Sequence, residues 1–262
     1  MKNWIDMELL ATSNIANKVR NTRLPRTKPL MPLFEVISNS IHSIEEAIQA
    51  GLLEADEGQI IIKCIRNGSN DTLSQLKEID NYPIHSFNVE DNGIGLNEDN
   101  MASFVEADTD HKIDIGGKGV GRFVCLKAFD MMQISSQFID KNKENKQITF
   151  DFKPTKIGFE NIKWTDSPIS RTGTNITLSK LKDTYQKNLD FSLHSVASEI
   201  VAHFKLYFIT GKAPKIIIRN QNTIEFDLNT LFITEFKSDV LDTSFTVEGE
   251  TFNLFLTKSL KN

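Results

Sequence analysis

Two glycine clusters, separated by a polar and acidic segment, form the part of the sequence best suited to chemistry. The first cluster is Asp91-Asn92-Gly93-Ile94-Gly95, and the second is Gly116-Gly117-Lys118-Gly119-Val120-Gly121. Because glycine adopts backbone conformations that side chains forbid, these clusters predict two unusual turns. Two such turns on either side of a mobile connector are typical of a site that closes over a ligand.

A carboxylate and an amide, Glu35 and Asn39, lie four residues apart in a segment with helical periodicity. Apolar residues recur at helical spacing through residues 31–50, which predicts an amphipathic helix. The spacing places Glu35 and Asn39 on one face of that helix, and His42 lies close to the same face. From these residues alone, solvent-exposed polarity accounts for the pair better than a binding role does.

The elements that must position these residues alternate between strands and helices. The hydrophobic pattern predicts strands at residues 59–66, 84–90, 131–138, 147–152 and 175–178, and helices at residues 120–129 and 191–208. The strand at 84–90 delivers Asp91 at its end, and the helix at 120–129 begins at the second glycine cluster. Loops that follow strand ends are where a scaffold presents binding groups.

The sequence pattern divides the chain into three parts. Residues 1–28 form an N-terminal extension, with a short helix expected around Trp4, Met7, Leu10 and Ile15. Its basic run, residues 20–28, is expected to be a solvated loop or a contact with a nucleotide or partner. Residues 29–212 form the main domain. Residues 213–262 form a linker and an incomplete β-rich module, with short strands expected at 216–218, 223–226, 231–236, 244–247 and 251–257.

Composition and charge exclude several classes of protein. The 262 residues are 39% hydrophobic and 25% charged, as in ordinary soluble globular proteins. No apolar run approaches the ~20 residues needed to cross a bilayer, and the N-terminus lacks a signal-peptide pattern, so a cytoplasmic location is expected. The net charge of −5 predicts no overall nucleic-acid surface, although it allows a local basic patch. Cys64 and Cys125 lie in apolar patterns and are expected to be buried free thiols.

Four motifs follow one another in a specific order. They are Glu35 and Asn39 on a helix, Asp91-x-Gly93-x-Gly95 after a strand, Gly116 to Gly121 opening a helix, and Gly173-Thr174 entering a strand. A dinucleotide-binding fold is excluded, because its glycines follow the first strand of a βαβ unit directly. The ordered set resembles the GHKL ATPases, which include DNA gyrase B, Hsp90, histidine kinases and MutL, and the MORC proteins share it. The resemblance covers residues 30–210.

The resemblance implies a fold and an adenine site. The expected architecture is the Bergerat fold, an α+β two-layer sandwich with a mostly antiparallel sheet and helices on one face, followed by the start of a β-rich transducer-like module. Asp91 is expected to accept a hydrogen bond from the adenine amino group, supported by Thr174. Gly93 and Gly95 are expected to let the backbone pass close to the base and ribose.

The resemblance also implies a phosphate and magnesium site. The residues expected near the phosphates are Lys112, Gly117, Lys118, Gly119, Val120 and Gly121, at the start of a helix whose free amides favour anions. Arg122 is expected to be structural or to lie at the base of the lid. Asn39 is expected to complete Mg²⁺ coordination together with the phosphates of ATP, because magnesium prefers hard oxygen ligands.

Glu35 determines the expected reaction. In the hydrolysing branches of the family this position activates the attacking water, whereas histidine kinases lack the glutamate. We therefore expect ATP hydrolysis with Glu35 as general base. Closure of the lid, Asn97 to about Ile115, is expected to drive homodimerisation and coupling to further domains or a protein client. The alternative is a nucleotide-binding switch with little turnover of its own, and the involvement of nucleic acid stays open.

The sequence departs from the nearest branches at two positions. Hsp90-like and MutL-like sequences carry Asp-Ala where this chain has His42 and Ser43. His42 either replaces the aspartate as a polar group or lines the pocket. The lysine that reaches the γ-phosphate in relatives is Lys258 or lies beyond Asn262. Similar phosphate turns occur in bacterial stand-alone and defence-associated ATPases, so anti-phage defence is one candidate role beside chaperone and repair functions.

Overall fold

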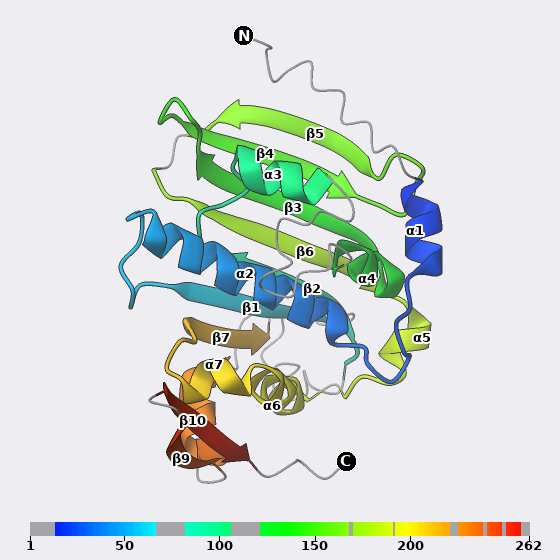
Figure 1. Ribbon diagram of the computed structural model, residues 1–262. Coiled ribbons are helices and arrows are strands. Elements are labelled where there is room, and N and C mark those ends of the chain that lie inside the picture. Colours follow the sequence, from blue (N-terminus) through cyan, green and yellow to red (C-terminus); the bar gives the residue numbers. More distant parts are fainter. Residues whose placement is uncertain are drawn as a thin grey trace, which may run out of the picture.

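The computed structural model describes residues 14–66, 82–105, 121–167, 170–190, 192–220, 225–237, 240–247 and 250–257. These residues form a two-layer α+β sandwich with one large, mostly antiparallel sheet (Figure 1). This confirms the predicted fold class, while the Bergerat assignment itself stays a prediction. None of the helices in these ranges is long and apolar enough to span a membrane.

The large sheet has eight strands in the order β5-β4-β3-β6-β2-β1-β7-β8. Their bounds are β1 Gln59–Arg66, β2 Ile84–Asp91, β3 Phe129–Ile139, β4 Asn145–Phe152, β5 Phe159–Asp166, β6 Gly173–Leu181, β7 Lys215–Asn220 and β8 Glu225–Asp227. Strands β1 and β7 are parallel, and the other neighbouring pairs are antiparallel. The five strands predicted in the main domain are confirmed. Strand β5, which carries no clear alternation, was not predicted.

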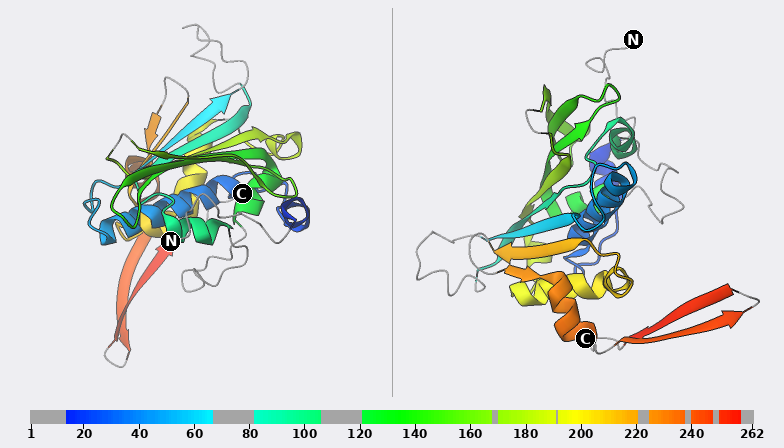
Figure 2. Two further views of the ribbon diagram at one scale, coloured as in Figure 1. Left: turned by 90° about the horizontal axis from the view of Figure 1, so that it is seen from above. Right: turned by 90° about the vertical axis from the view of Figure 1, so that its left-hand side faces the viewer.

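Helices cover one face of this sheet (Figure 2). The helical elements are α1 Ile15–Asn21, α2 Met31–Gln49, α3 Glu98–Val105, α4 Gly121–Ala128, α5 Asp183–Gln186, α6 Leu193–His203, α7 Lys205–Ile209, α8 Leu228–Leu231 and the π-helix η4 Phe232–Phe236. The predicted helix at 31–50 is α2, and the one at 120–129 is α4. The helix predicted at 191–208 is divided into α6 and α7 at Phe204.

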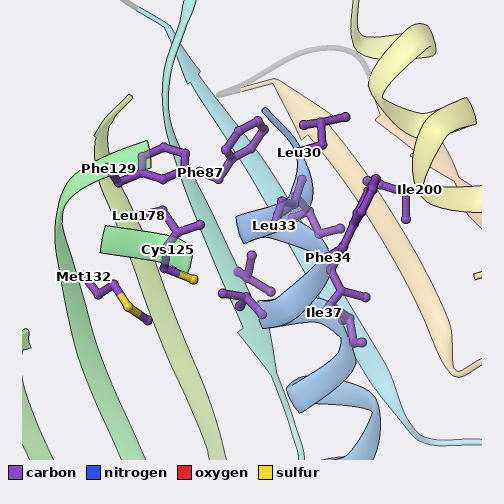
Figure 3. Close-up of a cluster of buried hydrophobic side chains, with 14 of the residues drawn as sticks. Leu30, Leu33, Phe34, Ile37, Phe87, Cys125, Phe129, Met132, Leu178 and Ile200 are labelled. Atoms are coloured by element: carbon purple, nitrogen blue, oxygen red, sulfur yellow. The ribbon is translucent and has the colours of Figure 1, made fainter. Parts of the chain in front are cut away.

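Helix α2 lies across the middle of the sheet because its apolar stripe has nowhere else to be buried. Leu33, Ile37 and Ile41 are at most 1% exposed. They recur every four residues, and Figure 3 shows Leu33 and Ile37 of α2 in one cluster of buried side chains with Phe87 of β2. Each such side chain stabilises the fold by about 1.5–3 kcal/mol relative to an exposed position. The helix is therefore held in one place, and so is the polar face that it presents.

Both cysteines belong to this core. Cys64 on β1 and Cys125 on α4 are buried free thiols, as predicted. Burial raises the pKa of the Cys125 thiol far above its ordinary range, with Glu35 as a second cause. The thiol therefore stays protonated and unreactive.

The expected mobile connector between the glycine clusters begins as an ordered helix. Residues 98–105 form α3, whose N-terminus is capped by Asn97 through a 2.9 Å bond from the Asn100 amide. Met101 is 2% exposed, and Phe104 packs edge-on against Phe152 with ring centroids 5.4 Å apart. Two apolar residues suffice to dock this short polar segment, so the first part of the predicted lid is helical. Residues 106–115 lie outside the described ranges.

The sheet continues past residue 212, where the second module was expected to begin. Strand β7 pairs in parallel with β1, and its Ile216 and Ile218 are completely buried. The strand predicted at 231–236 was wrong, because these residues are helical in α8 and η4. Asp227 caps that helical segment, and Phe232 and Phe236 bury their rings at helical spacing.

The last described segment is a separate β-hairpin. Strands β9, Val240–Val247, and β10, Glu250–Thr257, form their own two-stranded sheet, which confirms the two strands predicted there. The hairpin projects away from the main body (Figure 2, right).

Part of the predicted N-terminal extension belongs to the main body. Ile15 and Val19 of α1 are buried, and the Ile15 amide donates to the Lys156 carbonyl at 3.3 Å. Residues 1–13, with Trp4, Met7 and Leu10, lie outside the described ranges.

Candidate functional site

Asp91 lies at the end of β2 with its carboxylate enclosed by donors. The Ser40 hydroxyl on α2 donates to Asp91 Oδ2 at 2.8 Å, and the Gly93 amide donates to Oδ1 at 3.0 Å. Thr174 stands directly opposite Asp91 across the β2–β6 ladder, and its backbone also hydrogen-bonds the carboxylate. Asp91 is only 8% exposed. A charged group so little exposed in the core needs such partners.

The electrostatics of Asp91 follow from this enclosure. Burial raises the pKa of Asp91 to about 6, because the charged form loses its hydration. The hydrogen bonds from Ser40, Gly93 and Thr174 act in the opposite direction, and the neighbouring Glu90 raises the pKa slightly further. The carboxylate is thus ionised at neutral pH but close to titration.

Ser136 on β3 connects Thr174 to the turn that follows Asp91. Its hydroxyl is completely buried, lies 3.0 Å from Thr174 Oγ1 and donates to the Gly173 carbonyl at 3.1 Å. The Leu96 amide donates to Ser136 Oγ at 2.8 Å. Ser40 and Ser136 were both missed by sequence reasoning, because a single serine in a helix or strand pattern carries no signal.

The glycines of the first cluster are required by the protein itself. A Cβ on Gly93 would collide with the side chain and backbone of Ser43 on α2. Gly95 has a φ of +80°, and a Cβ there would collide with the Gln137 carbonyl of β3. The expected reason for these glycines was close approach to a ligand. The reason that the geometry supplies is close packing of the turn between α2 and β3.

Glu35 lies beside the start of α4. A Cβ placed on Gly121 would lie 2.5 Å from Glu35 Oε2, so the carboxylate rests against the bare Cα of this glycine. Glu35 is half-buried, and burial raises its pKa above the ordinary value of 4.5. A carboxylate with a raised pKa next to a helix N-terminus has the character of a general base. The structure thus joins residues of two motifs that are 86 positions apart.

Asn39 is exposed one turn after Glu35 on the same helix. One amide oxygen supplies a single hard ligand, which suits a Mg²⁺ ion that takes most of its ligands from phosphates and water. Among the described residues, no group of three or more His, Cys, Asp or Glu side chains is placed to hold a metal ion.

The second glycine cluster is described only at its end. Gly121 begins α4, whereas Lys112, Gly117, Lys118, Gly119 and Val120 lie outside the described residues, so their predicted phosphate contacts stay predictions. Arg122 makes structural contacts: its guanidinium lies over the rings of Phe104 and Phe123 and donates to the Ser103 carbonyl at 3.3 Å. It ties α4 to α3.

A hollow of about 500 Å³ lies elsewhere, on the open face of the sheet. Its lining includes Gln133, Ser135 and Thr177, whose side chains alternate with the buried residues that face the helices. It does not include Asp91, Glu35 or Asn39. The described motif residues lie instead on α2 and at the ends of β2 and β6, with Glu35 against Gly121 of α4.

Comparison with protein-family models gave no match, and a search of curated proteins gave no significant match.

Proposed function

We propose that this chain binds ATP together with Mg²⁺ and hydrolyses it as a GHKL-type ATPase. The observation that carries the proposal is the Asp91 carboxylate, buried at the end of β2 and held by Ser40, Gly93 and Thr174. A carboxylate in this setting keeps acceptor capacity for an exocyclic amine. A buried acceptor discriminates strongly against a base that lacks the donor, since the acceptor would then stay unpaired.

The proposed base is Glu35. Its position against Gly121 places it where the first turn of α4 offers free backbone amides, which favour the phosphate end of a nucleotide. Its raised pKa fits removal of a proton from water near neutral pH. The presence of this carboxylate favours transfer to water over transfer to a protein histidine.

Asn39 is the proposed protein ligand of Mg²⁺, which when bound neutralises phosphate charge. The exposed amide reaches solvent beside Glu35 on α2, so it contributes an oxygen without a local change of fold. In this proposal Asn39 binds the metal ion and Glu35, one turn earlier on the same helix, removes the proton from water.

Coupling of ATP to homodimerisation is part of the same proposal. It rests on the family resemblance, with closure of the lid, Asn97 to about Ile115, as the proposed trigger. Steady-state ATPase activity measured against protein concentration tests it, because a dimerising enzyme gains specific activity as concentration rises. Flat and very low activity at all concentrations, with retained ATP binding, would indicate the nucleotide-binding switch instead.

The adenine assignment is tested by Asp91→Asn. We expect ATP binding in isothermal calorimetry to be lost while the fold is retained, because the amide places a donor against the adenine amino group. Asp166→Asn, at an exposed position on β5, is the matched control and should bind like the parent. Parent-like affinity in Asp91→Asn contradicts the adenine assignment.

The hydrolytic assignment is tested separately by Glu35→Ala. We expect ATP affinity within about twofold of the parent and turnover lower by about 10²–10⁴-fold, the usual contribution of a general base. Glu45→Ala, on the same helix, is the control and should hydrolyse ATP normally. Parent-like turnover in Glu35→Ala would remove Glu35 from the mechanism without affecting the binding proposal.

A further inference from the structure

The charge of the chain is strongly uneven near its N-terminus. No Asp or Glu occurs from Leu9 to Phe34, although the whole chain carries a net charge of −5. The same stretch contains Lys18, Arg20, Arg23, Arg26 and Lys28. The last four lie in residues 20–28, named here the basic link, which joins α1 to α2 and was expected to be a solvated loop or a partner contact.

The backbone of the basic link is fixed to the body at several points. Lys127 on α4 donates from Nζ to the carbonyls of Val19 and Arg20, at 3.3 and 2.7 Å. The Tyr185 hydroxyl on α5 donates to the Leu24 carbonyl at 3.3 Å, and Leu24 packs against the core. The Lys28 amide closes a turn onto the Pro25 carbonyl at 3.0 Å. The link is therefore an ordered surface rather than a loose tether.

The four cations of the link point to solvent and are not neutralised. Arg20, Arg23, Arg26 and Lys28 are all exposed, and none forms an ion pair within the described ranges. On the sheet, by contrast, Lys63, Lys146 and Lys153 each lie within 4 Å of a carboxylate.

Further cations adjoin the link. Lys182 donates to the carbonyls of Leu126 and Lys127, next to the point where Lys127 holds the link. Asp130 is the acidic group that acts on Lys182. The positive field of the link extends to its neighbours. Burial raises the pKa of Tyr185 and Arg26 acts against it, whereas burial lowers the pKa of His203 and Lys28 adds to that effect.

We propose that the basic link binds the phosphodiester backbone of a nucleic acid, a function beyond ATP hydrolysis. Three of its four cations are arginines, whose planar guanidinium groups bind phosphate oxygens in pairs. When unpaired cations bind a polyanion, counterions are released from the polyanion, and this release favours binding. Because the backbone of the link is already held in place, little conformational entropy is lost. Contacts with phosphates fix the position of the protein on the nucleic acid but do not distinguish one base from another. We therefore expect binding that is independent of sequence.

A membrane surface fits these observations less well. Peripheral membrane binding needs apolar side chains that enter the lipid interface beside the cations. Leu24 is the one large apolar residue of the link, and it is turned toward the core. The surface therefore offers charge without an apolar anchor.

The proposal is tested by fluorescence anisotropy with a labelled 30-base-pair DNA duplex, without nucleotide, at rising salt. We expect the logarithm of the binding constant to fall linearly with the logarithm of the salt concentration. The expected slope is about −3 to −4, because each of four phosphate contacts contributes about −0.9. The triple variant Arg23→Glu, Arg26→Glu, Lys28→Glu should lose at least about tenfold in affinity. Labelled duplex RNA and single strands, measured in parallel, identify the preferred form of nucleic acid.

A matched variant separates local binding from overall charge. Lys143→Glu, Lys212→Glu, Lys237→Glu makes the same change in charge at exposed positions outside the link and should bind like the parent. Equal losses in both triple variants, or no duplex, single-strand or RNA binding at 50 mM salt, overturn the proposal. Binding to phosphatidylserine vesicles in place of nucleic acid also overturns it.

The same variants distinguish this proposal from the ATPase. Both should show the circular dichroism of the parent and bind ATP with unchanged affinity. A loss of ATP affinity confined to the link variant would assign these cations to the phosphates of ATP, and the nucleic-acid proposal would then be wrong. Nucleic-acid binding that persists in Asp91→Asn would support the link whatever becomes of the adenine assignment.

Discussion

Ser40 donates a 2.8 Å hydrogen bond to Asp91 Oδ2, and this bond joins helix α2 to the end of strand β2. Both residues are buried, at 3% and 8% exposure, so water cannot readily replace either partner. Burial raises the pKa of the Asp91 carboxyl, and this bond acts in the opposite direction. It therefore connects the stability of the fold to the protonation state of the proposed adenine acceptor.

Removing this donor should weaken both folding and nucleotide binding. Ser40→Ala leaves one oxygen of Asp91 without its buried donor, which costs about 1–3 kcal/mol of unfolding free energy. Urea denaturation and ATP calorimetry measure the two effects. Ser38→Ala, on the same helix and half-buried, is the control and should change neither. An unaltered midpoint in Ser40→Ala would show that water takes over the bond.

Adenine binding should depend on pH through Asp91. The pKa of Asp91 is raised to about 6, so below that pH the acceptor becomes protonated. We expect adenosine affinity to be about tenfold weaker at pH 5 than at pH 7, because only the ionised carboxylate accepts fully. Adenosine is the ligand to use, since it lacks titrating phosphates. Affinity that is constant from pH 5 to 8 would contradict the adenine role.

The same carboxylate predicts the sign of a stability change. The folded-state pKa lies above the ordinary value of 3.8, so the folded protein binds more protons than the unfolded chain between about pH 4 and 6. The contribution of Asp91 to stability is therefore greatest at low pH and declines as the pH rises through this window. Asp91→Asn, compared with the parent in urea at pH 4.5 and pH 7, should lack this component.

Gly121→Ala should impair hydrolysis more than folding. The added methyl group would lie 2.5 Å from Glu35 Oε2, the mobile end of a side chain, so the carboxylate moves while the backbone stays. We expect a melting temperature near that of the parent and turnover reduced by about tenfold or more, because misplacement of a general base is costly. Retained turnover would place Glu35 away from the reacting water.

Ser43→Ala should be neutral or stabilising. The Ser43 hydroxyl is buried against Gly93 and has no hydrogen-bond partner among the described residues. An unpaired buried hydroxyl costs free energy, and alanine removes it. Thermal unfolding should show an unchanged or higher midpoint. A marked fall in the midpoint would reveal a partner of Ser43, and the nucleotide would be the first candidate.

The β9–β10 hairpin should contribute little to the stability of the main body. It forms a sheet of its own, and one face carries Phe245, Phe252 and Leu254, which are 41–50% exposed. Their pairing register places them together on one face, whereas Thr246 and Thr251 pair on the opposite face. A chain ending at Lys237 should melt within about 2 °C of the parent and aggregate less, because isolated apolar surface promotes association. A large fall in melting temperature would show that the hairpin supports the body.

Local pattern in the amino-acid sequence is enough to specify several elements of the fold. The stripe of Leu33, Ile37 and Ile41 predicts α2 because a helix brings every third and fourth residue to one face, and only burial satisfies such a face. The strands β1 and β2 follow from alternation and from runs of isoleucine. The order of the four motifs, which include Glu35 and Asp91, can also be recognised without a structure, because it depends on residue types and spacing.

The contacts between residues far apart in the sequence depend on how the elements pack, and local pattern does not reveal them. Ser40 reaches Asp91 across 51 positions and Ser136 reaches Thr174 across 38, and neither serine differs in pattern from a solvated one. The sequence likewise left α3 as a connector and assigned β7 to a second module, because the docking of Phe104 and the parallel pairing with β1 are non-local events. Local propensity specifies how a segment folds; the burial of one segment against another specifies what its polar groups touch.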